Sequence, residues 1–213
     1  VAIELGGEDA KITYLKGGVE QRMNGSCAGG TGAFIDQMAN LLGTDAKGLN
    51  EYAKGHKTIY PIASRCGVFA KSDIQPLIND GAAKEDIAAS VLQSVVNQTI
   101  SGLACGKPIK GHVAFLGGPL HFLSELGARF VETLQPEEAI FPENSQVFNA
   151  IGAALSATKS FTADEIREGL ERLKTMESHE VQRLRPLFDS PEELEAFRAR
   201  HAKTEIAFAD IKL

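Results

Sequence analysis

The sequence predicts an α/β fold for residues 1–159, and three observations support this class. Short apolar runs that end in glycine pairs, a pattern typical of strands, open the chain and recur near residue 115. Elsewhere, apolar residues recur at helical spacing over long stretches. Strands at the start, followed by alternating helices and strands, predict a sheet covered by helices.

The first 23 residues predict a three-stranded meander. Its strands are expected at residues 1–5, 10–16 and 18–23. The pair Gly6-Gly7 supplies the first turn, and a second glycine pair at residues 17–18 supplies the next.

Amphipathic stretches predict the helices that follow. They are expected at residues 31–42, 45–54, 68–78, 84–104, 120–134 and 145–157. The longest, residues 84–104, carries Ile87, Val91 and Val95 at helical spacing. Further strands are expected at 58–63, 113–116 and 139–141. The first of these would lead into Cys66.

The composition changes at residue 160. Residues 160–213 hold 9 Lys and Arg and 12 Asp and Glu, a much higher charged share than the preceding residues. Two helices are expected there, at 163–176 and 191–201, and Thr162 with Glu165 forms a capping box before the first. We interpret this part as a solvated linker or docking segment, separate from the domain at 1–159.

Glycine-rich turns indicate a nucleotide site. Gly6-Gly7 follows the first strand, and Gly117-Gly118 follows the strand at 113–116. Between them, a Gly-Thr-Gly run at 30–32 precedes a helix. Glycines let backbone N–H groups approach phosphate oxygens closely, so the three elements together predict one nucleotide cradle.

Two of the three cysteines are expected at helix starts. Cys27 and Cys66 each precede an amphipathic stretch, where unpaired N–H groups and the helix dipole favour the thiolate that binds metal. The alternative is that both are buried packing residues, and no C-x-x-C pair is present. An iron–sulfur cluster needs four thiolates, which two chains would supply. Cys105 is expected to pack at a helix end.

These motifs resemble those of the ATP-dependent activators of 2-hydroxyacyl-CoA dehydratases, a family that includes the ATPase subunits of benzoyl-CoA reductase. The resemblance rests on the stretches Gly6–Lys11, Cys27–Gly32, Cys66–Ala70 and Gly117-Gly118, and covers roughly residues 1–159. It implies a ribonuclease-H-like lobe of the actin-like ATPase superfamily, which also includes sugar kinases and heat-shock chaperones.

The resemblance also implies the cofactors and the residues that hold them. ATP phosphates would bind at Gly6, Gly7 and Lys11, with Glu8 or Asp9 acting through Mg²⁺ or the attacking water. Gly30 and Thr31 would lie close by, and Gly117 and Gly118 would line the adenosine. Cys27 and Cys66 would ligate a 4Fe–4S cluster shared by the two chains of a homodimer. The partner would be a dehydratase or related reductase, and reduced ferredoxin or flavodoxin would supply electrons.

Two departures from the family pattern stand out. The family more often has Gln where Glu8 stands. The first phosphate loop of this fold is absent, and the chain begins in mid-strand without Met, so we interpret it as a fragment of a longer protein. ATP in this fold is held between two lobes. We therefore expect the isolated fragment to fold but to hydrolyse ATP negligibly.

Composition narrows the function classes. A net charge of −6 argues against nucleic-acid binding. No apolar run is long enough for a membrane span and no signal peptide is visible, so a cytoplasmic location is expected. Two alternatives stay open: a small-molecule kinase of the same fold, and a non-catalytic nucleotide-binding module that regulates a larger enzyme. Iron content would separate both from an electron-transfer protein.

Overall fold

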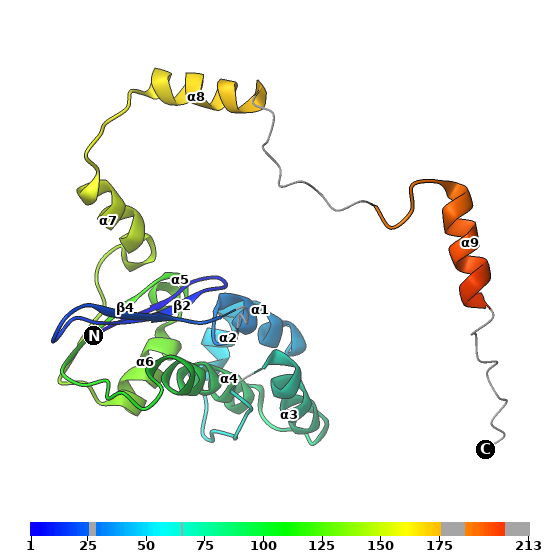
Figure 1. The fold of residues 1–213 in the computed structure, drawn as a ribbon. Coiled ribbons are helices and arrows are strands. Elements are labelled where there is room, and N and C mark those ends of the chain that lie inside the picture. The colour runs from blue at the N-terminus through cyan, green and yellow to red at the C-terminus, as the bar shows by residue number, and fades with distance from the viewer. Residues whose placement is uncertain (26–28, 65, 176–185, 203–213) are drawn as a thin grey trace, which may run out of the picture. The chain divides into compact units, whose positions relative to one another are not determined.

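The computed structural model describes residues 1–25, 29–64, 66–175 and 186–202. The chain forms two compact units, Val1–Ala157 and Thr158–Leu213, which we describe separately (Figure 1).

The first unit is built on one sheet, in which five strands of the described residues have the order β3-β2-β1-β4-β5. The strands are β1 (Ala2–Leu5), β2 (Ala10–Tyr14), β3 (Glu20–Met23), β4 (His112–Leu116) and β5 (Glu138–Ile140). The first three pair antiparallel, and β1 pairs parallel with β4, as β4 does with β5. This topology confirms the predicted meander and the ribonuclease-H-like lobe.

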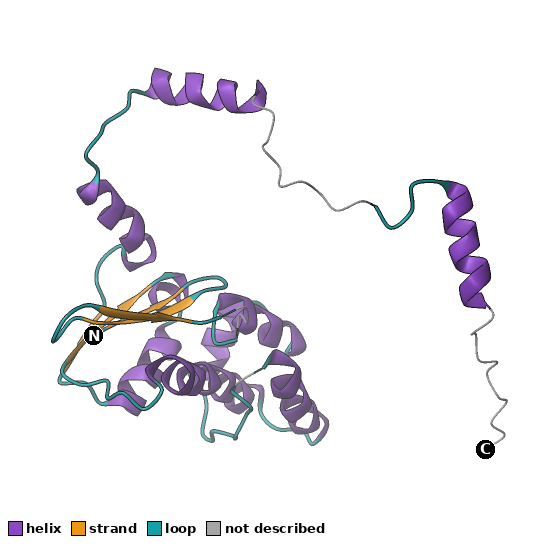
Figure 2. Ribbon diagram, viewed as in Figure 1, coloured by secondary structure: helices purple, strands orange, loops and turns teal. Residues whose placement is uncertain are grey.

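The helices of the first unit match most of the predicted stretches. They are α1 (Gly32–Leu41), α2 (Ala46–Ala53), α3 (Gly67–Asn79), α4 (Lys84–Thr99), α5 (Gly118–Phe122), α6 (Ser124–Leu134) and α7 (Phe148–Ser156). Helices α1, α2, α4 and α6 lie on one side of the sheet (Figure 2). Alternate strand residues such as Ile3, Ile12 and Phe115 are fully buried in the core.

Three predicted helices differ in detail. The stretch 84–104 is α-helical only to Thr99, and a π-helical turn, η1 (Ile100–Ala104), follows. The stretch 120–134 is two helices, because the buried Leu123 has extended backbone and its carbonyl accepts the first hydrogen bonds of α6. The stretch 145–157 begins with a 3₁₀ turn, η2 (Ser145–Val147). Cys105 ends η1 in the left-handed conformation and is exposed, so the prediction that it packs is wrong.

The strand predicted at Thr58–Ala63 is also wrong, since this segment carries no strand pairing. The apolar residues of this segment pack against the core, which explains their strand-like pattern. Its backbone N–H groups, however, donate to side chains of helices and not to a neighbouring strand. These bonds are Lys57 and Thr58 to Asp86 Oδ1 (2.6 and 2.9 Å), Tyr60 to Ser90 Oγ (2.7 Å) and Ala63 to Asp73 Oδ2 (2.7 Å). Side chains of α3 and α4 therefore fix the segment that leads to Cys66.

The second unit contains α8 (Ala163–Thr175) and α9 (Pro191–Ala202). The predicted capping box is confirmed: the Thr162 N–H donates to Glu165 Oε2 (2.7 Å), and the Glu165 N–H donates to Thr162 Oγ1 (3.2 Å). In both units, no described helix has the length and apolarity that crossing a membrane requires.

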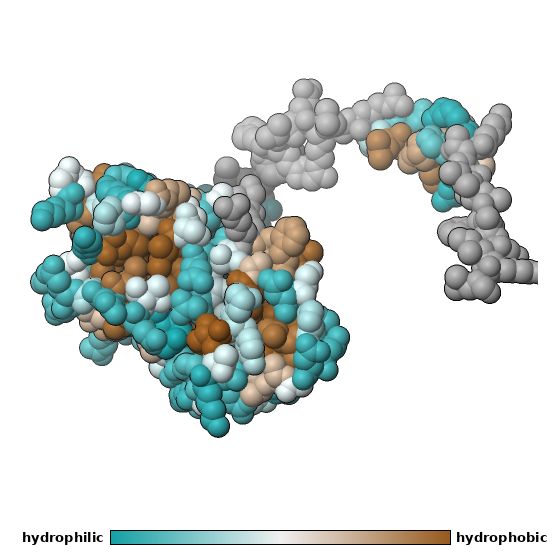
Figure 3. Space-filling view, turned by 90° about the horizontal axis from the view of Figure 1, so that it is seen from below, coloured by the Kyte–Doolittle hydropathy of each residue, from teal (hydrophilic) through white to brown (hydrophobic). Residues whose placement is uncertain are grey.

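On the face shown in Figure 3, apolar side chains of the first unit gather in separate patches bordered by polar ones. Among the exposed apolar side chains are Val68 and Phe69, in the first turn of α3, and Phe122 at the end of α5.

The hydrogen bonds from the Lys57 and Thr58 N–H groups to the Asp86 carboxylate, here called the Asp86 tether, predict that the stability of the fold depends on pH. The two backbone hydrogen bonds from Lys57 and Thr58 lower the pKa of Asp86 below its ordinary value. A lowered folded-state pKa stabilises the fold above the ordinary Asp pKa of about 3.9, and this stabilisation is lost as pH falls through the folded value. Asp86→Ala should therefore lower the melting temperature at pH 7, with the difference from wild type shrinking below about pH 4.

Asp80→Ala is the matched control, because it removes an exposed carboxylate at the end of α3. Thermal unfolding followed by circular dichroism from pH 3 to pH 8 measures both variants. A constant difference between Asp86→Ala and wild type over this range would contradict the tether.

Candidate functional site

The two predicted Gly-Gly turns meet through their backbones. Gly117 follows β4 with φ of +91°, and a Cβ placed there would lie 2.0 Å from the Leu5 carbonyl oxygen at the end of β1. No residue with a side chain fits this contact, and the positive φ independently favours glycine. Glycine at 117 therefore lets the β4–α5 turn rest directly on the end of β1, next to the β1–β2 turn.

Helix α1 begins on the same β1–β2 turn. The Gly32 N–H donates to the Gly6 carbonyl (3.0 Å), and the Ala33 N–H donates to the Gly7 carbonyl (2.7 Å). A Cβ at Gly32 would lie 3.3 Å from Gly7 Cα, so this contact is also close. Since the turn carbonyls occupy the first N–H groups of α1, the helix end is fixed to the turn.

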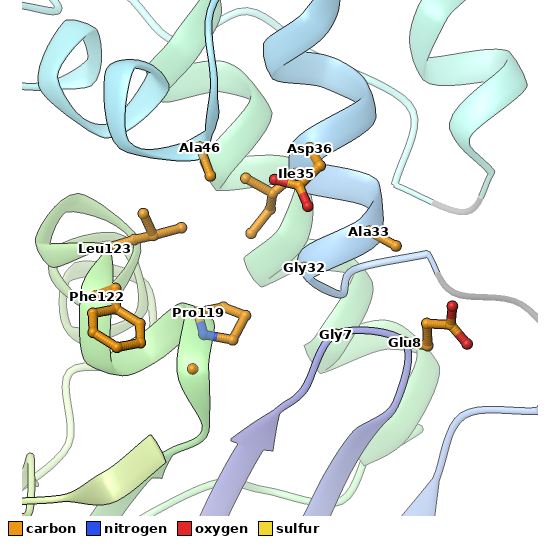
Figure 4. Close-up of a pocket in the computed structure, with 11 residues that line it drawn as sticks. Gly7, Glu8, Gly32, Ala33, Ile35, Asp36, Ala46, Pro119, Phe122 and Leu123 are labelled. Carbon is orange, nitrogen blue, oxygen red and sulfur yellow. The ribbon is translucent and has the colours of Figure 1, made fainter. Parts of the chain in front are cut away.

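A cavity of about 470 Å³ opens where these elements meet (Figure 4). Its wall is formed by the β1–β2 turn, the starts of α1 and α2, and both ends of α5 with the residue after it. It is lined by Gly7, Glu8, Gly32, Ala33, Ile35, Asp36, Ala46, Gly118, Pro119, Phe122 and Leu123. The volume lies in the range of small-molecule sites.

The chemistry of the cavity differs between its ends. The end formed by Ile35, Ala46 and Phe122 is apolar, while the other end is the glycine turn with its backbone amides. Asp36, on α1, adds an exposed carboxylate. Backbone amides suit phosphate and an apolar surface suits a base, so the arrangement fits a nucleotide.

The cavity includes some of the residues predicted for the site and not others. Gly7, Glu8 and Gly118 line it, and Gly6 and Gly117 lie directly behind through the backbone contacts. The apolar residues that close the other end were absent from the prediction, because their helical spacing indicates only a core.

Lys11, Asp9, Gly30 and Thr31 lie outside the lining. Lys11 faces its cross-strand partner Glu4, with Nζ 3.5 Å from Glu4 Oε1. Glu4 also accepts a hydrogen bond from Asn149 Nδ2 of α7 (2.6 Å).

The other three predicted residues flank the turn. Asp9 accepts the Gly6 N–H through its backbone carbonyl (2.7 Å). Thr31 is the buried N-cap residue of α1, and Gly30 packs against Gln98 of α4.

A larger cavity, of about 730 Å³, lies between α5, α6 and the segment after β5. Residues such as Gly127, Val131 and Phe141 line it, and no predicted site residue that the structure describes is among them. The predicted glycine turns therefore border the smaller cavity and not the larger one.

Cys66 is the N-cap residue of α3 and is half-buried. The start of α3 lies against α1: a Cβ at Gly67 would be 3.2 Å from Gln37 Oε1 and 3.8 Å from Phe34 Cδ2. Cys27 lies outside the described residues. Among residues 1–25, 29–64, 66–175 and 186–202, no group of three or more His, Cys, Asp or Glu side chains could hold a metal ion. This part of the chain offers one thiol at a helix start and no complete metal centre.

Comparison with known proteins places this geometry in a family. The family described as BadF/BadG/BcrA/BcrD ATPase matches residues 1–157. The 2-hydroxyisocaproyl-CoA dehydratase activator of Clostridioides difficile is 31% identical over 179 residues, which cover 82% of this chain and 64% of that protein. The (R)-2-hydroxyglutaryl-CoA dehydratase activating ATPase of Acidaminococcus fermentans is 38% identical over 160 residues, which cover 74% of this chain and 60% of that protein.

A solved structure gives the same result. The activator of the 2-hydroxyisocaproyl-CoA dehydratase from Clostridium difficile, with bound ADPNP, superposes with a TM-score of 0.65 at 28% identity, covering 84% of this chain and 64% of that one. This chain thus spans less than two thirds of the length of these relatives. The family match over the whole of the first unit shows that the chain belongs to the BadF/BadG/BcrA/BcrD ATPase family.

Proposed function

We propose that this chain is part of an ATP-dependent activator that donates one electron to a 2-hydroxyacyl-CoA dehydratase or a related CoA-ester reductase. The observation that carries the proposal is the cavity in which both glycine turns and the start of α1 meet. The activator relatives, one of them with a bound ATP analogue, support it.

ATP would lie with its phosphates at the turn of Gly6, Gly7 and Glu8 and its adenine at the apolar end of the cavity. Since the α1 amides at Gly32 and Ala33 already bond to turn carbonyls, the phosphates would meet the amides of the turn itself. Asp36 would accept hydrogen bonds from the ribose hydroxyls. Glu8 or Asp9 would orient the attacking water or hold Mg²⁺.

A 4Fe–4S cluster shared by two copies of the chain fits the described thiol. Cys66 stands at the start of α3, where the first N–H groups of the helix have no helical partners. Together with Cys27, each copy would provide two of the four ligands. When bound, the cluster would carry the electron that reduced ferredoxin or flavodoxin supplies. The exposed Val68 and Phe69 beside Cys66 leave room for a second copy at this end of α3.

The nucleotide site is tested by Gly118→Val. A Cβ at Gly118 meets no heavy atom within 4 Å, so the substitution is compatible with the fold. The side chain would project into the cavity and compete with the nucleotide. We expect the affinity for a fluorescent ADPNP analogue to fall at least about tenfold, or about 1.4 kcal/mol.

Gly152→Val is the matched control, because Gly152 has equally open surroundings but lies on α7, away from the cavity. Both variants should keep the wild-type circular dichroism spectrum. Equal affinity in Gly118→Val and wild type would place the nucleotide elsewhere.

The cluster is tested by exchanging cysteines one at a time. After anaerobic reconstitution, the wild-type protein should hold about four iron and four sulfide per two chains. Cys27→Ser and Cys66→Ser should each remove most of both, together with the broad visible absorbance. Cys105→Ser is the control, because Cys105 is an exposed thiol at the end of η1. Full iron content in Cys66→Ser would refute the assignment, and loss in Cys105→Ser would point to that thiol instead.

Catalytic turnover is proposed for a chain of the relatives' length. Phosphoryl transfer needs groups held around the whole γ-phosphate, and the described residues provide one side of such a cradle. Residues 1–213 should therefore hydrolyse ATP negligibly beside a chain extended at its N-terminus. Equal turnover numbers would show that all catalytic groups lie within these residues.

A further inference from the structure

Asn24, the residue after β3, spans the two peptide groups that flank Asp9. Its Oδ1 accepts a hydrogen bond from the Ala10 N–H (2.8 Å), and its Nδ2 donates to the Glu8 carbonyl (3.1 Å). Its own backbone N–H donates to the Ala10 carbonyl (3.0 Å). The half-buried Asn24 side chain therefore binds the backbone of the β1–β2 turn on both sides of Asp9, beside the two acidic residues of the turn, Glu8 and Asp9.

Pairing between β2 and β3 does not provide partners for the Ala10 N–H and the Glu8 carbonyl. This pairing ends with Lys11 opposite Met23, so within the part of the chain that the structure describes the residues before Ala10 have no partner strand on this side. Within the turn, the Gly6 N–H donates to the Asp9 carbonyl (2.7 Å) and closes its other side. The Asn24 amide replaces the next rung of the ladder for Glu8 and Ala10.

The two bonds require a carboxamide. The Ala10 N–H needs an acceptor and the Glu8 carbonyl needs a donor, and Asn presents both on one short side chain. Aspartate, with nearly the same shape, accepts from Ala10 but, when ionised, cannot donate to Glu8. The residue type therefore matches the geometry on both sides.

We propose that Asn24 is a positioning residue of the phosphate-binding turn, which fixes the backbone of Glu8 and Asp9 and thereby the carboxylate, that of Glu8 or Asp9, that would orient the attacking water or hold Mg²⁺. This inference rests on the proposed function, because it assigns Asn24 a role in ATP hydrolysis. Small displacements of such groups slow phosphoryl transfer more than they weaken nucleotide binding. Loss of the Asn24 bonds should therefore appear in kcat more than in KM.

The first measurement is amide hydrogen exchange without nucleotide. In Asn24→Ala, the Ala10 amide should exchange about tenfold faster, since it loses its acceptor. In Asn24→Asp, the acceptor is kept and Ala10 should stay protected. Gln21→Ala is the matched control: it removes a side-chain bond on the same strand, from Gln21 Nε2 to Thr13 Oγ1 (3.2 Å), without touching the turn.

The second measurement is steady-state ATP hydrolysis by the chain extended to the length of its relatives. Both Asn24 variants should lower kcat about tenfold while KM changes less than about threefold, and Gln21→Ala should change neither. If Asn24→Ala proves unstable, the nearly isosteric Asn24→Asp provides the kinetic test, provided that it melts at the same temperature as the wild-type protein. Wild-type kcat in Asn24→Asp, or unchanged exchange of the Ala10 amide in Asn24→Ala, would overturn the inference.

The two measurements separate this inference from the function on which it rests. A wild-type protein that neither binds nor hydrolyses ATP would refute the proposed function and with it the catalytic role of Asn24. Exchange at Ala10 would still report whether Asn24 holds the turn.

Discussion

The site depends on a backbone contact that side chains would prevent. The β4–α5 turn rests on the end of β1 because Gly117 has no Cβ, and α1 starts on the β1–β2 turn because Gly32 lies close to Gly7. Each contact joins segments that are far apart in sequence. The parallel pairing of β1 with β4 brings the two turns to one edge of the sheet, and the glycines let them touch. A cavity with amides at one end and apolar side chains at the other follows from that geometry.

A second set of interactions places the start of α3. The segment before Cys66 has no strand partner, and it is held by carboxylates and a hydroxyl from α3 and α4. Because α4 also packs on α1, the two helices that follow the cysteines share one support. The cavity at the glycine turns and the Cys66 thiol are therefore connected through packed helices, with α1 common to both.

The strands that end in glycine turns can be predicted from the sequence, because a strand that ends in Gly-Gly is a local pattern. The pattern predicts both turns without the contact between them. What the sequence missed depends on distant partners. The apolar run at 58–63 resembles a strand, yet helix side chains provide its hydrogen-bond partners. The strand register that sets Lys11 opposite Glu4 likewise depends on a pairing that the local sequence does not show. Phe122 and Ala46 lie in predicted helices, and only the folded structure shows that they line one cavity.

The pairing of β1 with β4 also sets an order of events during synthesis. Ala2 lies beside Ala114, so the central strand of the sheet receives its parallel neighbour only after the chain has been synthesised as far as Ala114. Until then the β1–β2–β3 meander presents the apolar residues Ile3, Leu5 and Ile12 without their full cover. Contacts of such sequence separation slow folding, and an uncovered strand edge invites pairing with other chains. The nascent protein should therefore depend on chaperones until β4 emerges, and expression at low temperature should favour soluble product.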